Sequence, residues 1–418
     1  MIKVYTNKSK KKMPSLSCKR RGRTVKKAKR MNAFSASIFA ELTAYRQKQR
    51  HLHDEWIDLS VGSPDLPPAP FVREAIARYA NEPNAYGYTL KGIREFHEAV
   101  ADYYRTAHGV VLDPETEVTY VIGSQDGLVH LPMVFADPGD VILLPDPGYP
   151  AYAAGVAMAE AVPYFLPLRE ENSFLPDLRA IPEDIAKRTT IMFINFPGNP
   201  VPAVATESFY REVVEFAKRY DILVVSDFAY GELYYDGNKP VSFLSVPGAK
   251  DVGVEINSLS KSYNMAGCRV GYLCGNAEVI RAFAEFKSNL DYGIFWPLQK
   301  AAAEVLRHGA GFCAESRMIY QARRDALVDG LADIGWTVDR PQAGMFVWAK
   351  IPDGFTSLSF AKALIDQAGV VVTPGHAFGP SGEGYVRIAL VQPENVLRLA
   401  VEKLKATGLF ASPAADRR

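Results

Sequence analysis

The sequence predicts an α/β protein, with a doubly wound, mostly parallel sheet in a large domain and a smaller α+β domain formed by the N- and C-terminal parts. From about residue 93 to 280, continuous apolar runs rich in β-branched residues alternate with helical stretches. Continuous rather than alternating runs indicate strands buried on both faces, and their alternation with helices is typical of a doubly wound sheet. The pattern changes after about residue 295, which indicates a second domain.

The predicted elements follow one another in a simple order. A helical stripe of apolar residues begins near Ser37, and the segment WIDLSVGSPDLPPAP predicts a short strand running into a Gly/Pro loop. Helical stretches after residue 295 lead into WTVDRPQAGMFVWAKI, which we expect to form an antiparallel pair, and then into the strand YVRIAL and a last helix. The strands predicted for the large domain are 118–122, 140–145, 190–195, 222–227 and 252–257.

These patterns divide the chain into four segments. Residues 1–30 form a basic extension without a fold of its own, and residues 31–65 form an N-terminal arm that contributes to the small domain. Residues 66–295 form the large, ligand-binding domain, and residues 296–418 form the C-terminal small domain.

Composition narrows the class of protein. Of the 418 residues, 48% are apolar and 23% are charged, as in ordinary globular proteins. No apolar run approaches the roughly 20 residues that span a bilayer. The four cysteines show no C-x-x-C spacing, so neither a disulfide framework nor a metal site is predicted, and the cytoplasm is the expected location.

The basic extension is the one strong charge asymmetry. Residues 1–30 carry thirteen Lys or Arg and no Asp or Glu. Such a block could contact nucleic acid or a membrane surface. It could equally be a translated upstream stretch or a targeting sequence, although it lacks the apolar segment of a secretory signal. We expect an extension that the protein does not need for activity.

In open α/β sheets, ligands bind at the carboxyl ends of the strands. The turn Gly123-Ser124-Gln125 follows the first run and could bind a phosphate at a helix N-terminus, although such a turn is more often a plain cap. Tyr149, in DPGYPAY, could stack on a flat ligand or simply pack in a loop. Asn199 stands in a turn dipeptide after the third run.

Two further strand ends carry the chemistry. Asp227 could cap a helix, or it could pair with a buried cation such as a protonated ring nitrogen. Lys261 lies among Ser258, Ser260 and Arg269, where burial and cationic neighbours lower a lysine pKa and favour the neutral amine that forms Schiff bases. A phosphate site, such a lysine, a stacking aromatic and a carboxylate for a ring nitrogen together describe pyridoxal 5'-phosphate (PLP).

These motifs resemble those of the fold-type I PLP-dependent aminotransferases of the class I/II superfamily, over about residues 36–408. The set comprises S-x-S-K at Lys261, an R-x-G that begins eight residues later, an Asp-x-x-Tyr about thirty residues upstream, and an Asn-Pro before it. The segments GSPDLPPAP and SNLDYGIF are similar to the branch that holds the LL-diaminopimelate and alanine or aspartate aminotransferases.

The resemblance implies a role for each residue around the cofactor. Lys261 would form the covalent link to PLP and move the substrate proton, and Asp227 would pair with the ring nitrogen. Tyr230 and Asn199 would hydrogen-bond the phenolic oxygen of the ring, and Tyr149 would stack on its face. The residues implied for the phosphate are Ser124, Gln125, Ser258, Ser260 and Arg269, with Tyr88 reaching the phosphate of the partner subunit.

The substrate residues follow from the same resemblance. Arg387, in GYVRIAL, would hold the α-carboxylate as a fork, and the backbone at Gly62 would meet the same group. Asp291 lies in the segment where dicarboxylate-specific relatives often carry an arginine. The sequence departs from the family in two places: the interval from Tyr88 to Gly92 is one residue short, and N-P-V-P replaces N-P-T-G at 199–202.

The function implied is transfer of an amino group between an L-amino acid and a 2-oxo acid by a ping-pong mechanism, in a homodimer with shared active sites. A PLP-dependent carbon–sulfur β-lyase, which has the same fold and lysine site, is an alternative. A transcription regulator that uses an aminotransferase domain as a ligand sensor is a second. Thirty residues with few apolar positions cannot build a helix-turn-helix core, so we expect neither nucleic acid nor membrane as a partner.

Overall fold

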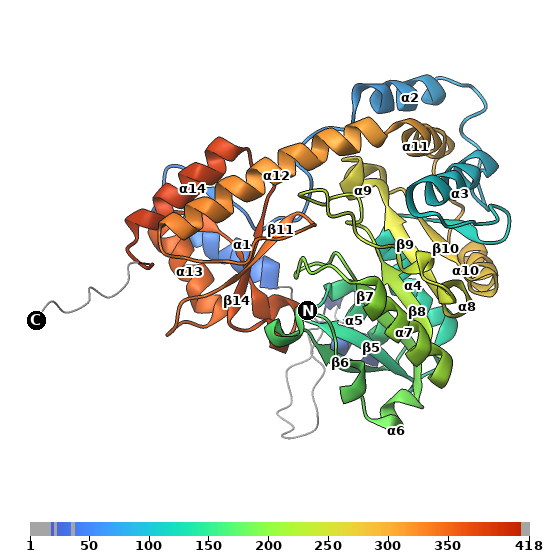
Figure 1. The fold of residues 1–418 in the computed structure, drawn as a ribbon, viewed down its shortest axis with the longest axis horizontal. Coiled ribbons are helices and arrows are strands. Elements are labelled where there is room, and N and C mark those ends of the chain that lie inside the picture. The colour runs from blue at the N-terminus through green and yellow to red at the C-terminus, as the bar shows by residue number, and fades with distance from the viewer. Residues whose placement is uncertain (1–17, 21–22, 35–37, 411–418) are drawn as a thin grey trace, which may run out of the picture.

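The computed structural model describes residues 18–20, 23–34 and 38–410 of the chain. They form a large α/β domain and a smaller α+β domain, and the long helix α12 (Ala310–Asp333) runs from one to the other (Figure 1). None of the helices in these ranges is long and apolar enough to cross a membrane.

A seven-stranded sheet forms the centre of the large domain. The strands are β4 (Val118–Val121), β10 (Gly271–Gly275), β9 (Gly253–Ser258), β8 (Leu223–Asp227), β7 (Thr189–Asn195), β5 (Val141–Asp146) and β6 (Val162–Pro167), in that spatial order. Only β10 runs antiparallel to its neighbours; the other pairs are parallel. The predicted fold class is confirmed. The strands β6 and β10 were not predicted, because one contains a proline and the other is a five-residue run between glycines.

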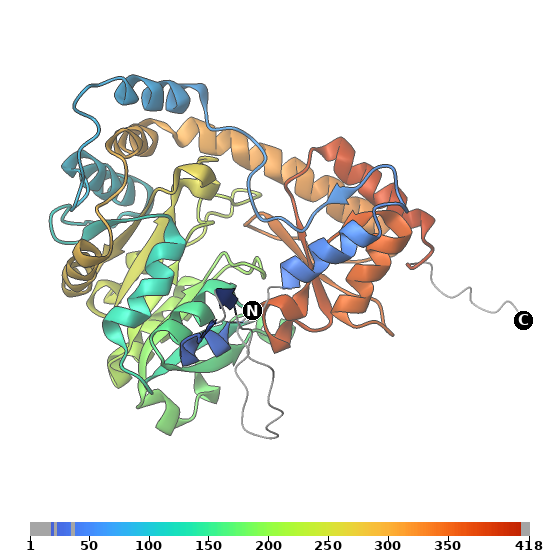
Figure 2. The same cartoon turned by 180° about the vertical axis from the view of Figure 1, so that it is seen from behind.

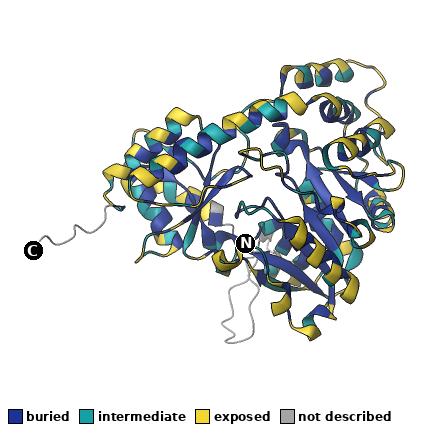
Figure 3. Ribbon diagram, viewed as in Figure 1, coloured by how far each residue is buried: buried dark blue, intermediate teal, exposed yellow. Residues whose placement is uncertain are grey.

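Helices cover both faces of this sheet, which buries its strands (Figure 3). On one face pack α3 (Arg94–His108), α7 (Glu207–Tyr220) and α11 (Trp296–His308), and on the other α4 (Ser124–Phe135), α5 (Pro150–Met158) and α10 (Ala277–Leu290). Successive residues of β5 show the arrangement, because Leu143 belongs to the first core and Ile142 and Leu144 to the second. This two-sided burial explains why the strand runs are continuously apolar.

Local signals explain where individual helices begin and end. The hydroxyl of Thr206 accepts a hydrogen bond from the backbone N–H of Phe209 at 3.2 Å and so caps α7. Phe209, Val213 and Ala217 then recur at helical spacing on its buried face. The helix ends at Tyr220, and the next residue, Asp221, caps it in a left-handed conformation with φ of 57°.

The small domain combines segments from both ends of the chain (Figures 1 and 2). Its antiparallel sheet has the order β11 (Phe346–Lys350), β14 (Tyr385–Ala389), β13 (Thr373–Pro374), and it packs with α13 (Ser357–Ala368) and α14 (Glu394–Ala406). The N-terminal arm supplies α1 (Ile38–Lys48), which lies across the domain in Figure 2, and β3 (Ile57–Asp58), which pairs with β12 (Val370–Val371).

One expectation about this region needs correction. The stretch WTVDRPQAGMFVWAKI contains one strand rather than an antiparallel pair, since Pro341 and Gly344, with its positive φ of 80°, interrupt its first half. The partner of β11 is β14 instead. Residues of α11 are buried in the same core as those of α3, so we propose that the large domain extends beyond the predicted boundary at residue 295 into α12.

The basic extension lies largely outside the described residues. Within it, Cys18–Arg20 (β1) pairs antiparallel with Arg23–Val25 (β2), and a short 3₁₀ turn covers Lys29–Ala33. Residues 1–17 lie outside the described ranges, so the expectation that they have no fold of their own stays a prediction.

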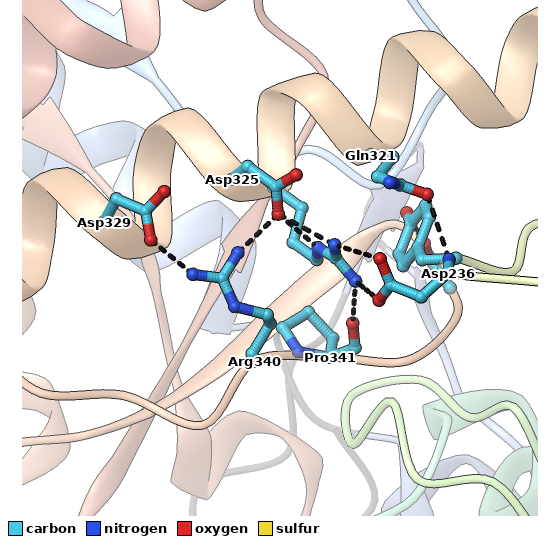
Figure 4. A network of polar contacts seen from close by, with 9 residues as sticks. Asp236, Gln321, Asp325, Asp329, Arg340 and Pro341 are labelled. Atoms are coloured by element: carbon cyan, nitrogen blue, oxygen red, sulfur yellow. Dashed lines mark hydrogen bonds and ion pairs between the residues drawn. The ribbon is translucent and has the colours of Figure 1, made fainter. Parts of the chain in front are cut away.

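A polar network fixes α12 to the loop after β8 (Figure 4). The guanidinium of Arg324 forms a fork with the Asp236 carboxylate, with Nη1–Oδ2 at 2.6 Å and Nη2–Oδ1 at 3.0 Å, and donates to the carbonyl oxygen of Pro341 at 3.1 Å. The Arg324 side chain is 2% exposed. Arg340 continues the network on the outside of α12 by pairing with Asp325 and Asp329. The network therefore ties the loop that follows β8 to α12 and to the segment before β11.

We predict that Arg324→Ala lowers the free energy of unfolding by about 2 kcal/mol, the range expected when hydrogen bonds to a charged partner are lost. Arg340→Ala, which removes a side chain that is 42% exposed, is the matched control and should cost less than about 1 kcal/mol. Urea unfolding of both variants measures the difference. Equal losses would contradict the role given to Arg324.

Candidate active site

The site begins at the carboxyl ends of three adjacent parallel strands. Asn195, the last residue of β7, is in register with Asp227, the last residue of β8, and Asp227 is in register with Ile256 of β9. The short helix α9 (Leu259–Ser262), which carries Lys261, follows β9 directly. Parallel strands therefore place the predicted carboxylate and lysine at one edge of the sheet.

A cavity of about 380 Å³ opens at this edge, between the two domains. Tyr149 and Asn199 line it from the large domain, and Arg387 lines it from the small domain. The N-terminal arm supplies the remaining wall through α1 and the segment 58–62.

Asp227 is a buried carboxylate at the base of this edge. Its Oδ2 accepts a hydrogen bond from the Tyr152 hydroxyl at 2.8 Å, and its Oδ1 accepts one from the backbone N–H of Ala229 at 3.3 Å. Burial raises the pKa of the Asp227 carboxyl to about 6. In the described part of the chain it forms no ion pair within 4 Å. Such a carboxylate suits a protonated ring nitrogen, which would supply the missing positive charge.

Lys261 donates a hydrogen bond from Nζ to the carbonyl oxygen of Gly62 at 2.6 Å. This contact joins α9 of the large domain to the N-terminal arm. Burial, together with the positive charges of Arg387 and Arg269 and against the attraction of Asp227, lowers the pKa of the Lys261 ammonium to about 8. The fraction of neutral amine, the nucleophilic form, is therefore far larger near neutral pH than for an ordinary lysine.

Beside the lysine lies a cradle for an anion. The buried hydroxyl of Ser258 donates to the Ser260 hydroxyl at 2.8 Å. Arg269 reaches across to the turn before α4, where its Nη2 lies 3.4 Å from the carbonyl oxygen of Ile122. A Cβ on Gly123 would come within 2.3 Å of that Nη2, so only glycine permits this approach. The N-terminus of α4 at Ser124 adds backbone donors and a positive dipole end, as a phosphate requires.

Three more predicted residues lie close to these groups. The Tyr149 hydroxyl donates to Oε1 of Gln125 at 2.9 Å, which ties the loop after β5 to the start of α4. Tyr230 is 6% exposed, and burial raises the pKa of its hydroxyl, so it remains a hydrogen-bond donor. Asn199 uses its Oδ1 to accept from Nη1 of Arg387 at 2.7 Å. A bond to a phenolic oxygen would use its Nδ2 instead, so the two roles are compatible.

Arg387, on β14 of the small domain, is a buried cation that is 3% exposed. Its Nη2 donates to the carbonyl oxygen of Ser60 at 2.6 Å, and its guanidinium carbon lies 4.3 Å from the centre of the Phe346 ring. Its Nε is buried and has no hydrogen-bond partner among the described residues. Burial lowers the pKa of Arg387 to about 10, yet it remains charged at neutral pH. A fork with unused donors is the geometry that binds a carboxylate.

Two predicted residues do not join this group within one chain. Tyr88 is 81% exposed and its ring lies 4.9 Å from that of Tyr292. Asp291 accepts a hydrogen bond from the Tyr120 hydroxyl at 2.9 Å and forms an ion pair with the buried Lys287, which also pairs with Asp126. The carboxylate of Asp291 is thus already paired, and it does not line the cavity beside Arg387. Its expected contact with substrate is not supported in the single chain.

Sequence reasoning missed several supporting residues. Tyr152 lies in the same DPGYPAY motif as Tyr149, but nothing in the motif shows which of the two hydroxyls reaches Asp227. Arg323 forms a fork with Asp65, at 2.7 Å and 2.8 Å, and thereby holds the loop that follows Gly62. Such pairs join residues far apart in the chain, and a single sequence carries no signal for them.

Comparisons with known proteins agree with this geometry. Residues 54–404 match the model of the aminotransferase class I and II family. The chain belongs to this family. It is 44% identical over 382 residues to the LL-diaminopimelate aminotransferase of Moorella thermoacetica, covering 91% of this chain and 98% of the relative. The enzyme of the same name from Aquifex aeolicus is 43% identical over 377 residues, with coverages of 90% and 97%.

Solved structures have the same fold. Substrate-bound BacF from Bacillus subtilis superposes with a TM-score of 0.89 at 37% identity, covering 93% of this chain and all 100% of the other. A probable N-succinyldiaminopimelate aminotransferase from Thermus thermophilus gives a TM-score of 0.85 at 34% identity, with coverages of 89% and 100%.

The protein is therefore a PLP-dependent aminotransferase, as the sequence predicts. Its residues fit the cofactor: a buried carboxylate without a counter-ion, a lysine of lowered pKa and an anion cradle lie at one sheet edge. Neither the carbon–sulfur lyase nor the transcription regulator receives support from these comparisons.

The lowered pKa of Lys261 gives a testable pH dependence. Only the neutral amine can attach to PLP, so the rate of attachment to apoenzyme should rise with pH and reach half its maximum near pH 8. Stopped-flow absorbance on adding PLP measures this rate. Arg387→Gln removes one of the charges that lower the pKa, so it should move the midpoint to higher pH. A midpoint near the ordinary lysine value, about 10.4, would contradict the assignment.

Proposed function

We propose that this aminotransferase moves an amino group between LL-diaminopimelate and a 2-oxo acid. The observation that carries the proposal is similarity to LL-diaminopimelate aminotransferases at 40–44% identity over nearly their whole length. The cavity supports it, because the Arg387 fork is placed to hold the α-carboxylate that every amino donor carries.

Each residue of the site has a proposed role in the reaction. When bound, PLP supplies a conjugated ring that withdraws electrons from the substrate Cα. Arg387 and the backbone at Gly62 hold the α-carboxylate and so fix the direction of the Cα–H bond. Lys261 would accept the Cα proton on Nζ and later release it, and its lowered pKa leaves neutral amine available for this near neutral pH. Asp227 keeps the ring nitrogen protonated, and Tyr152 holds the Asp227 carboxylate in place.

The remaining predicted residues are assigned to positioning the cofactor. Tyr149 is proposed to stack on the ring face, and Tyr230 and Asn199 to donate to its phenolic oxygen. The proposed phosphate ligands are Ser124, Gln125, Ser258, Ser260 and Arg269. Support comes from the contact between Arg269 and the turn before Ser124, which places the two halves of this set together.

The donor proposal predicts a clear outcome in a substrate screen. Purified enzyme with PLP, LL-diaminopimelate and 2-oxoglutarate should form glutamate, with a kcat/KM at least tenfold above those for aspartate and alanine. Formation of pyruvate and ammonia from cystathionine, without glutamate, would instead indicate the lyase. No glutamate from LL-diaminopimelate would contradict the proposed substrate, while glutamate from another donor would leave the aminotransferase activity in place.

We also propose a homodimer in the cytoplasm whose active sites are shared. Around Tyr88 the surface exposes a group of aromatic side chains: Tyr88 is 81% exposed, Tyr86 69% and Tyr292 58%. An exposed aromatic patch of this kind is typical of an interface. Burial against a second copy would bring Tyr88 towards the phosphate of that copy, as the family resemblance implies.

Mixing two impaired variants tests the shared site. Lys261→Ala removes the covalent anchor, and Tyr88→Phe weakens phosphate binding at the other subunit's site. If Tyr88 acts across the interface, one of the two sites in a mixed dimer combines both wild-type residues. Co-refolded variants should therefore regain activity and tight PLP binding at one site per dimer. Activity no higher than the sum of the separate variants would contradict a shared site.

A further inference from the structure

The cavity that Arg387 lines contains a second arginine, paired with an aspartate. Nη1 of Arg46, at the end of α1, lies 2.5 Å from Oδ2 of Asp58. Asp58 also accepts through Oδ1 from the backbone N–H of Ser60 at 3.0 Å and from the Ser60 hydroxyl at 2.6 Å. Neither the sequence motifs nor the residues assigned above account for this pair.

The pair is connected directly to the α-carboxylate site. The carbonyl oxygen of Ser60 accepts from Nη2 of Arg387, while the same residue's N–H and hydroxyl hold Asp58. Asp58 and Ser60 are two positions apart, so their Cα atoms are separated by at most about 7 Å. The two arginines therefore contact two neighbouring positions of a single short segment and line the same cavity.

The pair is also accessible to a ligand. The side chains of Arg46 and Asp58 are 35% and 29% exposed, and a partly exposed ion pair contributes only about 0–1 kcal/mol, so exchanging its partners costs little. In the described part of the chain Arg46 makes no other side-chain hydrogen bond than that to Asp58, and a guanidinium has five N–H donors. Donors therefore remain for a second carboxylate.

Charge and polarity in the cavity match a particular kind of substrate. Two arginines and one aspartate give the binding wall a net charge of +1. An amino acid with a second amino-acid group at its far end presents two carboxylates and one ammonium besides the reacting amine, a net charge of −1. Apolar side chains of Leu42, Val61 and Val371 line the same cavity and suit the methylenes between the charged ends.

We propose that Arg46 and Asp58 together bind the distal amino-acid group of the donor, with Arg46 on the distal carboxylate and Asp58 on the distal ammonium. This inference rests on the proposed function and adds the residues that select a donor with an amino-acid group at both ends. Arg387 binds one end of such a molecule, and the Arg46–Asp58 pair binds the other end.

Four donors that differ only at the distal end test the pair. LL-diaminopimelate carries both distal groups, L-lysine lacks the distal carboxylate, L-2-aminopimelate lacks the distal ammonium, and L-norleucine lacks both. Ratios of kcat/KM between donors cancel any general loss of activity in a variant. The enzymes compared are wild type, Arg46→Gln, Asp58→Asn and the control Lys48→Gln, which changes an exposed residue of the same helix.

Arg46→Gln should lower the ratio of LL-diaminopimelate to L-lysine about tenfold, because only the first donor has a carboxylate for Arg46. Asp58→Asn should lower the ratio of LL-diaminopimelate to L-2-aminopimelate by a similar factor. Lys48→Gln should keep both wild-type ratios.

The outcomes separate this inference from the proposed function. If wild type uses LL-diaminopimelate but both ratios persist in the variants, or if a variant slows all four donors equally, the pair only anchors α1 and the inference is wrong. If wild type does not use LL-diaminopimelate at all, the proposed substrate fails, and the inference fails with it.

Discussion

Burial of three charged groups in one cleft is the constraint on which the rest of this structure depends. The three groups lie on three different elements: Asp227, Lys261 and Arg387. Burial removes water from around each of these side chains. Desolvating a charge is costly unless partners compensate. Here the partners are Tyr152 for Asp227, the Gly62 carbonyl for Lys261, and Asn199 with Ser60 for Arg387. The site therefore exists only when both domains and the N-terminal arm are in place.

The same constraint explains the architecture around the cleft. The parallel register of β7, β8 and β9 brings Asp227 and the start of α9 to one edge, and α12 carries the small domain with Arg387 to the opposite side. The segment between β3 and Asp65 crosses between them, and its backbone carbonyls meet both Lys261 and Arg387. Arg323 fixes the end of that segment. A short arm thus connects the catalytic and the substrate-binding charges.

Much of this could be predicted from the sequence because its signals are local. Continuous apolar runs predict buried parallel strands, and the polar residue that ends each run marks the ligand edge, as Asp227 and Lys261 show. Pairings between distant segments carry no such signal. Tertiary packing decides the partner of β11 and the place of α11 in the core of the large domain. It also decides the pairing of Asp291 with Lys287 and the approach of Arg46 to Asp58. A single sequence does not encode them in any pattern that can be recognised.

The proposed chemistry depends on Lys261 being the residue that binds the cofactor covalently, and one measurement tests this assignment directly. Borohydride reduction of the PLP-loaded enzyme makes the covalent link permanent, and peptide mass spectrometry then locates the modified residue. We expect a single phosphopyridoxyl group, attached to Lys261. Modification of another lysine, with Lys261 unmodified, would contradict the assignment and the geometry built around it.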